Sequence, residues 1–186
     1  MLGVKNILIK SLDYFLPKYS KNFLWNKLGN TLKKCNFNKI KLLNSRILIT
    51  GGTGYVGSWV VHGLASINET YKLNIEITLL TSNPKNLNKY SYLNKKIKIN
   101  YKLNEISKFI KIKKKYTHLI HAAAKYKGNK KEINKTNILG SKNIIKFIDY
   151  KKIENIIFLS SGAVYDYDIE KIKLQENAKK INYQNK

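Results

Sequence analysis

Three glycines spaced three residues apart are the first residues whose pattern could do chemistry. Gly51, Gly54 and Gly57 form G-x-x-G-x-x-G inside the stretch ITGGTGYVGSWVV, residues 49–61. A phosphate that binds at the start of a helix needs backbone N–H groups within hydrogen-bonding distance, and a Cβ atom would hold it away. The helix N-terminus adds a partial positive charge of about half a unit. The pattern predicts a dinucleotide-binding loop, with a purely structural glycine turn as the alternative.

Other reactive side chains are few. The three histidines, His62, His118 and His121, have no carboxylate or cysteine partner at metal-ligand spacing, so the sequence predicts no metal site. Cys35 is the single cysteine, which suits a reducing cytoplasm. From spacing alone, His121 is best interpreted as a hydrogen-bonded core histidine. Ser161 follows an apolar run, at the sheet edge where open α/β proteins bind their ligands.

The elements that must position these residues alternate from residue 46 onward. Short apolar runs predict five strands, at 46–50, 75–81, 97–101, 117–124 and 155–161. Helical spacing between the runs predicts three helices, one beginning near Val56 and the others at 105–115 and 131–150. This alternation predicts an α/β fold, a Rossmann-like doubly wound parallel sheet with right-handed crossovers.

The amino-terminal part of the chain has a different character. Residues 1–44 alternate apolar groups with lysine and asparagine at roughly helical spacing. We interpret them as an N-terminal helical extension of two or three short amphipathic helices, with a partly ordered tail as the alternative. The domain organisation expected is this extension at 1–44 and an NAD(P)-binding Rossmann domain at 45–186.

The charge of the chain is strongly basic, with 36 Lys and Arg residues and a formal net charge of +25. Only Arg46 is an arginine, although arginine is the usual residue for base and phosphate recognition. We therefore expect a solvated lysine surface and no nucleic-acid partner. Residues 47–68 carry no charge but contain glycines and polar groups, which argues against a membrane span. The sequence predicts a cytoplasmic chain. The lack of charge also predicts that the helix after the glycines is buried on all sides and has no solvated face.

Four motifs carry a family resemblance, ITGGTGYVG, HLIHAAA, NILGSKNII and IIFLSSGAVY, in this order. With them the chain resembles the extended short-chain dehydrogenase/reductases over residues 46–176. Within these it is similar to the NAD-dependent epimerase/dehydratase family that acts on nucleotide sugars. The resemblance implies a Rossmann domain followed by a smaller substrate domain, NAD or NADP as cofactor, and a nucleotide-sugar substrate. A homodimer is left open.

The resemblance also implies roles for individual residues. The cofactor-binding set that it implies is Gly51, Thr53, Gly54, Tyr55, Val56, Gly57, His121, Ala122, Ala123 and Ser160. Ser161 aligns with the catalytic serine or threonine that hydrogen-bonds the reacting hydroxyl or ketone. Tyr183, with Lys186 beside it, is the candidate for the family's tyrosine–lysine acid/base pair. Asn137 matches a helix asparagine that has a structural and sometimes a proton-relay role.

Departures from the family pattern limit what it implies. Thr81, Ser82 and Asn83 stand where the family often has an acidic residue for the ribose, so the choice between NAD and NADP stays open. Gly162 and Ala163 replace the acidic pair of the sugar 4,6-dehydratases, which favours epimerase, reductase or decarboxylase chemistry.

The tyrosine–lysine pair departs as well. Tyr183 and Lys186 are three residues apart, where the family motif needs four. We expect the true pair to lie beyond residue 186, with the C-terminal substrate domain missing, and residues 1–186 alone to be inactive.

These observations predict an NAD(P)-dependent nucleotide-sugar epimerase/dehydratase-type oxidoreductase, with this chain as its cofactor-binding part. A non-catalytic dinucleotide-binding remnant or scaffold is the first alternative. A basic nucleic-acid or membrane-surface binder is the second.

Overall fold

A five-stranded parallel sheet forms the centre of the protein. The computed structural model describes residues 28–31, 34, 38–82, 84–108, 113–151, 153 and 155–161. The strand order is β3-β2-β1-β4-β5, and every pairing within it is parallel. The strands are β1 (Arg46–Thr50), β2 (Glu76–Thr81), β3 (Lys98–Leu103), β4 (His118–His121) and β5 (Asn155–Phe158). All five predicted strands are therefore confirmed, and β4 and β5 end three residues earlier than expected.

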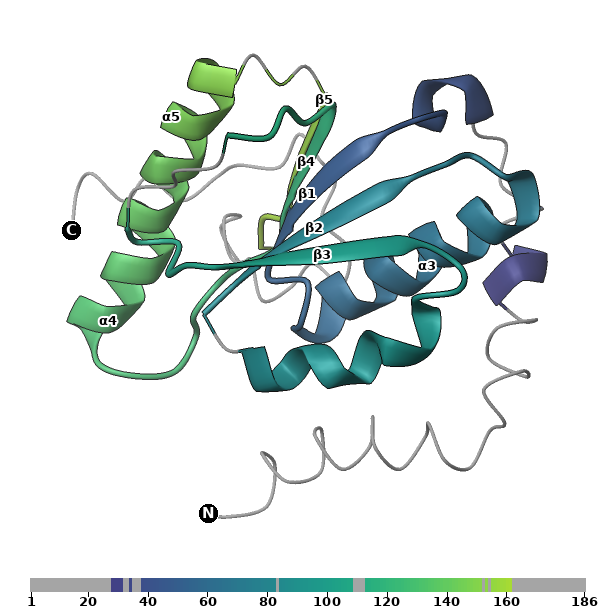
Figure 1. Ribbon diagram of the computed structural model, residues 1–186. Coiled ribbons are helices and arrows are strands. Elements are labelled where there is room, and N and C mark those ends of the chain that lie inside the picture. The colour runs from purple at the N-terminus through teal and green to yellow at the C-terminus, as the bar shows by residue number, and fades with distance from the viewer. Residues whose placement is uncertain are drawn as a thin grey trace, which may run out of the picture.

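Helices cover both faces of this sheet, as Figure 1 shows. On one face lie α3 (Tyr55–Tyr71) and the 3₁₀ segment η2 (Pro84–Leu93). On the other lies a nearly continuous helix made of α4 (Lys130–Asn134), the π-helical turn η3 (Lys135–Leu139) and α5 (Gly140–Lys151). A short 3₁₀ turn, η1 (Lys39–Leu42), precedes β1.

Alternation along β1 divides the core into two layers. Ile47 and Ile49 point to the face of α3 and η2, where they join one buried cluster. Leu48, between them, points to the opposite face and packs with Ile144 and Phe147 of α5. Because successive strand side chains point to opposite faces, an all-apolar strand needs a helical layer on each side. The arrangement confirms the Rossmann-like doubly wound fold.

Two expectations about helices are corrected by the structure. Residues 105–108 form a turn and not the start of a helix, while 109–112 lie outside the described residues. The expectation that α3 has no solvated face is wrong, because Tyr55, Val56 and Trp59 are 62%, 49% and 44% exposed. These side chains lie in the first turns of α3, and burial becomes continuous only from Leu64 to Ile67.

The predicted N-terminal extension lies mostly outside the described residues. Within 1–44 the structure describes helical residues at 28–31 and 34, and η1. In the part of the chain that the structure describes, no helix combines the length and the apolar character needed to cross a membrane.

A half-buried carboxylate lies at the amino-terminal end of the strands. Glu76 begins β2 and forms ion pairs with Lys114 at 2.5 Å and with Lys98 at 3.1 Å, and it accepts a hydrogen bond from Asn100 at 2.6 Å. Burial raises the pKa of Glu76, but the hydrogen bonds from these three partners outweigh burial and lower the pKa to about 2. The carboxylate therefore stays charged at any pH near neutrality.

Candidate functional site

The first glycine of the motif is required by the fold itself. Gly51 follows β1 with a φ of +68°, in the left-handed region that favours glycine. A Cβ atom at Gly51 would lie 2.5 Å from the carbonyl carbon of Ala122 and 2.6 Å from the nitrogen of Ala123. The structure therefore brings the glycine loop into direct contact with the backbone that follows β4. Three of the predicted cofactor-binding residues come together here.

Gly57 is required for a similar reason, whereas Gly54 is not. A Cβ atom at Gly57 would lie 2.2 Å from the carbonyl oxygen of Gly51, so the loop folds directly onto the first turn of α3. Among the residues that the structure describes, a Cβ atom at Gly54 would meet only that same oxygen, at 3.2 Å. Two of the three glycines thus serve internal packing, and the middle one is the least crowded of the three by the described residues.

The start of α3 offers backbone donors next to Gly54. Gly54 is the N-cap residue and forms no side-chain capping bond, and its carbonyl accepts the first helical hydrogen bond, from the Ser58 amide at 3.0 Å. The amides of Tyr55 and Val56, in the first turn, have no acceptor within the helix. With the helix dipole, these N–H groups suit a phosphate. An open side at Gly54 beside such donors fits the pyrophosphate of a dinucleotide.

His121 ends β4 inside the sheet. Its ring is 2% exposed, and Nδ1 lies 2.6 Å from Oγ1 of Thr50 on the neighbouring strand. Nε2 lies 3.4 Å from Oγ of Ser141, and the ring centroid is 4.6 Å from that of Phe158. Burial lowers the pKa of His121, so the ring stays neutral at pH 7. The side chain occupies a hydrogen-bonded core position, which leaves the backbone after it as the part that borders the glycine loop.

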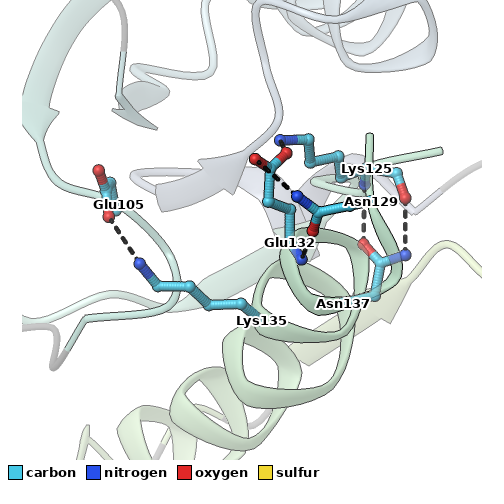
Figure 2. A network of polar contacts seen from close by, with 6 residues as sticks. All are labelled: Glu105, Lys125, Asn129, Glu132, Lys135 and Asn137. Carbon is cyan, nitrogen blue, oxygen red and sulfur yellow. Dashed lines mark hydrogen bonds and ion pairs between the residues drawn. The ribbon is translucent and has the colours of Figure 1, made fainter. Parts of the chain in front are cut away.

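Asn137 fixes the loop that leaves β4. Its Nδ2 donates to the carbonyl oxygen of Lys125 at 2.8 Å, and its Oδ1 accepts from the Lys125 amide at 2.7 Å (Figure 2). Nζ of Lys125 pairs with Glu132 at 2.6 Å, and Asn129 caps α4 through the Glu132 amide at 2.9 Å. Figure 2 also shows Lys135 reaching Glu105, 3.9 Å away. Asn137 therefore has a structural role here, as a two-point clamp on this loop.

The π-helical turn makes that clamp available. Asn137 lies at the centre of Lys135–Leu139, where the helix winds more widely than an α-helix. π-Helical turns occur frequently at functional sites, and this one presents its amide to the loop beside the predicted cofactor site.

The predicted serines lie at the carboxyl end of the sheet. Ser160 and Ser161 follow β5, and both are exposed. β5 pairs with β4 in parallel, so the serines leave the sheet at the same edge as His121 and Ala122. Tyr183, the other predicted catalytic residue, lies outside the described residues. The roles of the two serines stay predictions.

The end of β2 has little to select one cofactor over another. Thr81 ends the strand and is buried, and its carbonyl accepts from the Asn104 amide at 2.9 Å. Ser82 follows and is exposed. The sequence has no carboxylate from Thr81 to Asn104. A group that would repel a 2′-phosphate is therefore absent from this segment.

Sequence reasoning missed a tyrosine that contacts the glycine loop. Tyr90 on η2 is buried, and its hydroxyl donates a hydrogen bond to the carbonyl oxygen of Gly52. Its neighbour Tyr92 bonds instead to Nε2 of His62 on α3, at 2.5 Å. Leu87, Tyr90 and Leu93 recur every three residues, as the buried side of a 3₁₀ helix would, but this spacing does not identify the partner of either tyrosine hydroxyl.

Comparison with known proteins agrees with this geometry. Residues 47–186 match the model of the NAD dependent epimerase/dehydratase family. A protein of Methanocaldococcus jannaschii named "Putative UDP-glucose 4-epimerase" is 34% identical over a region that covers 64% of this chain and 39% of that protein.

Two solved structures share the fold. A UDP-N-acetylglucosamine 4-epimerase from Methanobrevibacter ruminantium, in complex with UDP-N-acetylmuramic acid, aligns with a TM-score of 0.57 at 21% identity. The alignment covers 75% of this chain and 44% of that one. A UDP-glucose-4-epimerase from Stenotrophomonas maltophila, with bound NAD and formylated UDP-arabinopyranose, aligns at 0.55 and 16% identity, covering 74% and 43%.

The chain thus spans less than half the length of each of these relatives. The family model, in contrast, covers three quarters of this chain and includes the glycine loop, the end of β4 and the serines after β5. The chain belongs to the NAD dependent epimerase/dehydratase family.

Proposed function

We propose that residues 45–186 form the NAD(P)-binding part of a nucleotide-sugar oxidoreductase of the epimerase/dehydratase type, with residues 1–44 as an extension. One observation carries the proposal. Cβ atoms at Gly51 and Gly57 would collide with the chain's own backbone, whereas a Cβ atom at Gly54, beside the first turn of α3, would meet only the carbonyl oxygen of Gly51 among the described residues, at 3.2 Å. A purely structural glycine turn would have no reason to keep the middle position open.

In this proposal each part of the glycine loop has its own task. The amides of Tyr55 and Val56 hydrogen-bond the pyrophosphate, and Thr53 borders it. The backbone of Ala122 and Ala123, in contact with Gly51, limits the site on the side of β4. Asn137 keeps the loop after β4 in place through Lys125. A bound nicotinamide would supply the hydride acceptor or donor.

The substrate is proposed to be a nucleotide sugar held at the carboxyl edge of the sheet. Support comes from the relatives, which are named as epimerases of UDP-glucose or UDP-N-acetylglucosamine. Ser161, exposed at this edge, would orient the reacting hydroxyl. A serine hydroxyl is too weakly basic to take a proton unaided, so the proton would pass to an acid/base group such as Tyr183. The single cysteine of the chain favours a cytoplasmic location.

Titration with cofactor tests the proposal directly. The protein is titrated with NAD⁺, NADH, NADP⁺ and NADPH by calorimetry, with UDP-glucose and UDP-N-acetylglucosamine present and absent. We expect saturable 1:1 binding of at least one cofactor, and tighter binding when a nucleotide sugar is present. Absence of binding by all four cofactors at millimolar concentration would refute the proposal. Binding of cofactor without any effect of nucleotide sugars would instead favour a non-catalytic dinucleotide-binding protein.

A further inference from the structure

A buried tyrosine ties the segment after β2 to the glycine loop. Tyr90 lies on η2 and is 2% exposed, and its hydroxyl donates to the carbonyl oxygen of Gly52. Burial, with a smaller contribution from Tyr92, raises the pKa of Tyr90 above its ordinary value. The hydroxyl is therefore protonated, and can donate, throughout the working pH range of a protein.

The carbonyl oxygens of the first two loop residues are both bonded to donors of the chain itself. That of Gly51 accepts from the Gly54 amide at 2.9 Å, and that of Gly52 accepts from Tyr90. Gly52 also packs closely on β2, since a Cβ atom there would lie 2.7 Å from Cδ2 of Leu79. A carbonyl oxygen turned toward an anion repels it, whereas consecutive N–H groups attract it. Because the carbonyl oxygens of Gly51 and Gly52 are both hydrogen-bonded within the protein, an anion beside Gly54 faces the N–H groups at the start of α3 and not these oxygens.

We propose that Tyr90 is a positioning residue for the pyrophosphate site, which acts by holding the carbonyl of Gly52 away from the bound anion. The inference rests on the proposed dinucleotide-binding function. It assigns to η2, which carries no carboxylate for the ribose, a different part in cofactor binding: it sets the conformation of the loop that meets the phosphates.

Tyr92 offers a matched comparison on the same segment. Its hydroxyl lies 2.5 Å from Nε2 of His62, and Nδ1 of His62 lies 2.6 Å from the carbonyl oxygen of Ser58. Because a carbonyl only accepts, Nδ1 of His62 carries a proton in this contact, which leaves Nε2 as the ring nitrogen that pairs with the Tyr92 hydroxyl. Both tyrosines thus fasten η2 by one hydroxyl each, Tyr90 to the loop and Tyr92 to the body of α3.

The experiment compares Tyr90→Phe with Tyr92→Phe. Each variant removes one hydroxyl and keeps the ring. Affinity for NAD⁺ is measured by calorimetry, and affinity for adenosine, which has no phosphate, by saturation-transfer NMR. We expect Tyr90→Phe to weaken NAD⁺ binding about tenfold or more, since a buried carbonyl left without its donor is costly enough to rearrange the loop. Adenosine binding should stay within twofold, and Tyr92→Phe should leave both affinities within twofold of the parent protein.

Three outcomes overturn the inference about Tyr90 without contradicting the proposed cofactor-binding function. These are unchanged NAD⁺ affinity in Tyr90→Phe, an equal loss of NAD⁺ and adenosine affinity in that variant, and an equal loss of NAD⁺ affinity in Tyr92→Phe. A Tyr90→Phe protein that does not fold, as judged by circular dichroism, assigns the hydroxyl to folding and also overturns it. If the parent protein itself binds no NAD⁺, the proposed function fails, and this inference fails with it.

Discussion

A single methyl group at Gly54 should separate binding from folding. In the unliganded protein the added Cβ of Gly54→Ala meets only the carbonyl oxygen of Gly51, at 3.2 Å, which a shift of a few tenths of an ångström relieves. Alanine is a poorer N-cap than glycine but restricts the unfolded chain more, and these two effects are of similar size and opposite sign. We therefore expect the free energy of unfolding to change by less than about 1 kcal/mol.

A bound pyrophosphate could not accommodate the added methyl group by such a small shift. A phosphate oxygen that accepts from the first-turn amides sits about 2.9 Å from each nitrogen, on the open side of Gly54. A methyl group there pushes the phosphate out of range of about two hydrogen bonds to a charged acceptor, worth roughly 1.5–3 kcal/mol each. The loss of about 3–6 kcal/mol corresponds to about 10²–10⁴-fold weaker binding. Gly54→Val should abolish binding.

The assay for this prediction is calorimetric titration with NAD⁺ beside thermal unfolding of the same samples. Gly63→Ala is the matched control, because Gly63 lies in the same helix and no other described part of the chain comes within 4 Å of its Cβ position. It should keep the affinity of the parent protein and gain up to about 1 kcal/mol of stability from helix propensity. If Gly54→Ala folds normally and binds NAD⁺ like Gly63→Ala, the phosphate does not sit at this loop.

Three further outcomes are expected. Because no carboxylate stands between Thr81 and Asn104, NADP⁺ should bind within about tenfold of NAD⁺; a preference for NAD⁺ beyond a hundredfold would show that an acidic group reaches the ribose from elsewhere. The folded-state pKa of Glu76 is lowered to about 2, so the charged carboxylate stabilises the folded state. Because its lysine partners are partly exposed, this contribution to the free energy of unfolding is on the order of 1–2 kcal/mol. It is fully present above pH 5 and is lost as the pH falls toward 2. In Glu76→Gln, the free energy of unfolding measured with denaturant should depend less on pH between 2 and 5. The same pH dependence as in the parent protein would contradict this. Thr50→Val, which leaves Nδ1 of His121 without its partner at 2.6 Å, should lower the free energy of unfolding by about 1–3 kcal/mol in urea titrations, and an effect below about 0.5 kcal/mol would contradict the contact.

The sequence predicted the sheet well because its signal is local. Runs such as RILIT are apolar, β-branched and short, and a strand buried on both faces needs no more than that. Glycine spacing similarly predicted the loop, since Gly51 and Gly57 have steric requirements that only glycine meets. The contact of that loop with Ala122 was not predicted, because it depends on β4 lying beside β1, and the sequence pattern did not give the order of the strands.

What could not be predicted depends on contacts between distant segments. The bond from Tyr90 to Gly52 spans 38 residues, and it exists only because η2 packs beside α3. The exposure of Tyr55 and Trp59 in the first turns of α3 could not be predicted either, since both are as apolar in sequence as the buried residues after them. That the His121 ring is a hydrogen-bonded core side chain depends on its contact with Thr50, a residue 71 positions away, and not on the residues next to His121 in the sequence.

The π-helical turn at Lys135–Leu139 amounts to a one-residue insertion inside an otherwise continuous helix. One extra residue displaces the angular phase of everything downstream by about 100°, since an α-helix has 3.6 residues per turn. Within this turn Asn137 meets the backbone of Lys125, and downstream of it Ile144 and Phe147 pack against the sheet. Deleting a single residue here would restore a regular α-helix. Either the Asn137 side chain would then no longer point toward Lys125, or the apolar face of α5 would no longer point toward the sheet. The length of this segment is therefore under a constraint that substitutions alone would not reveal, and a relative with one residue fewer must secure the loop after β4 by other means.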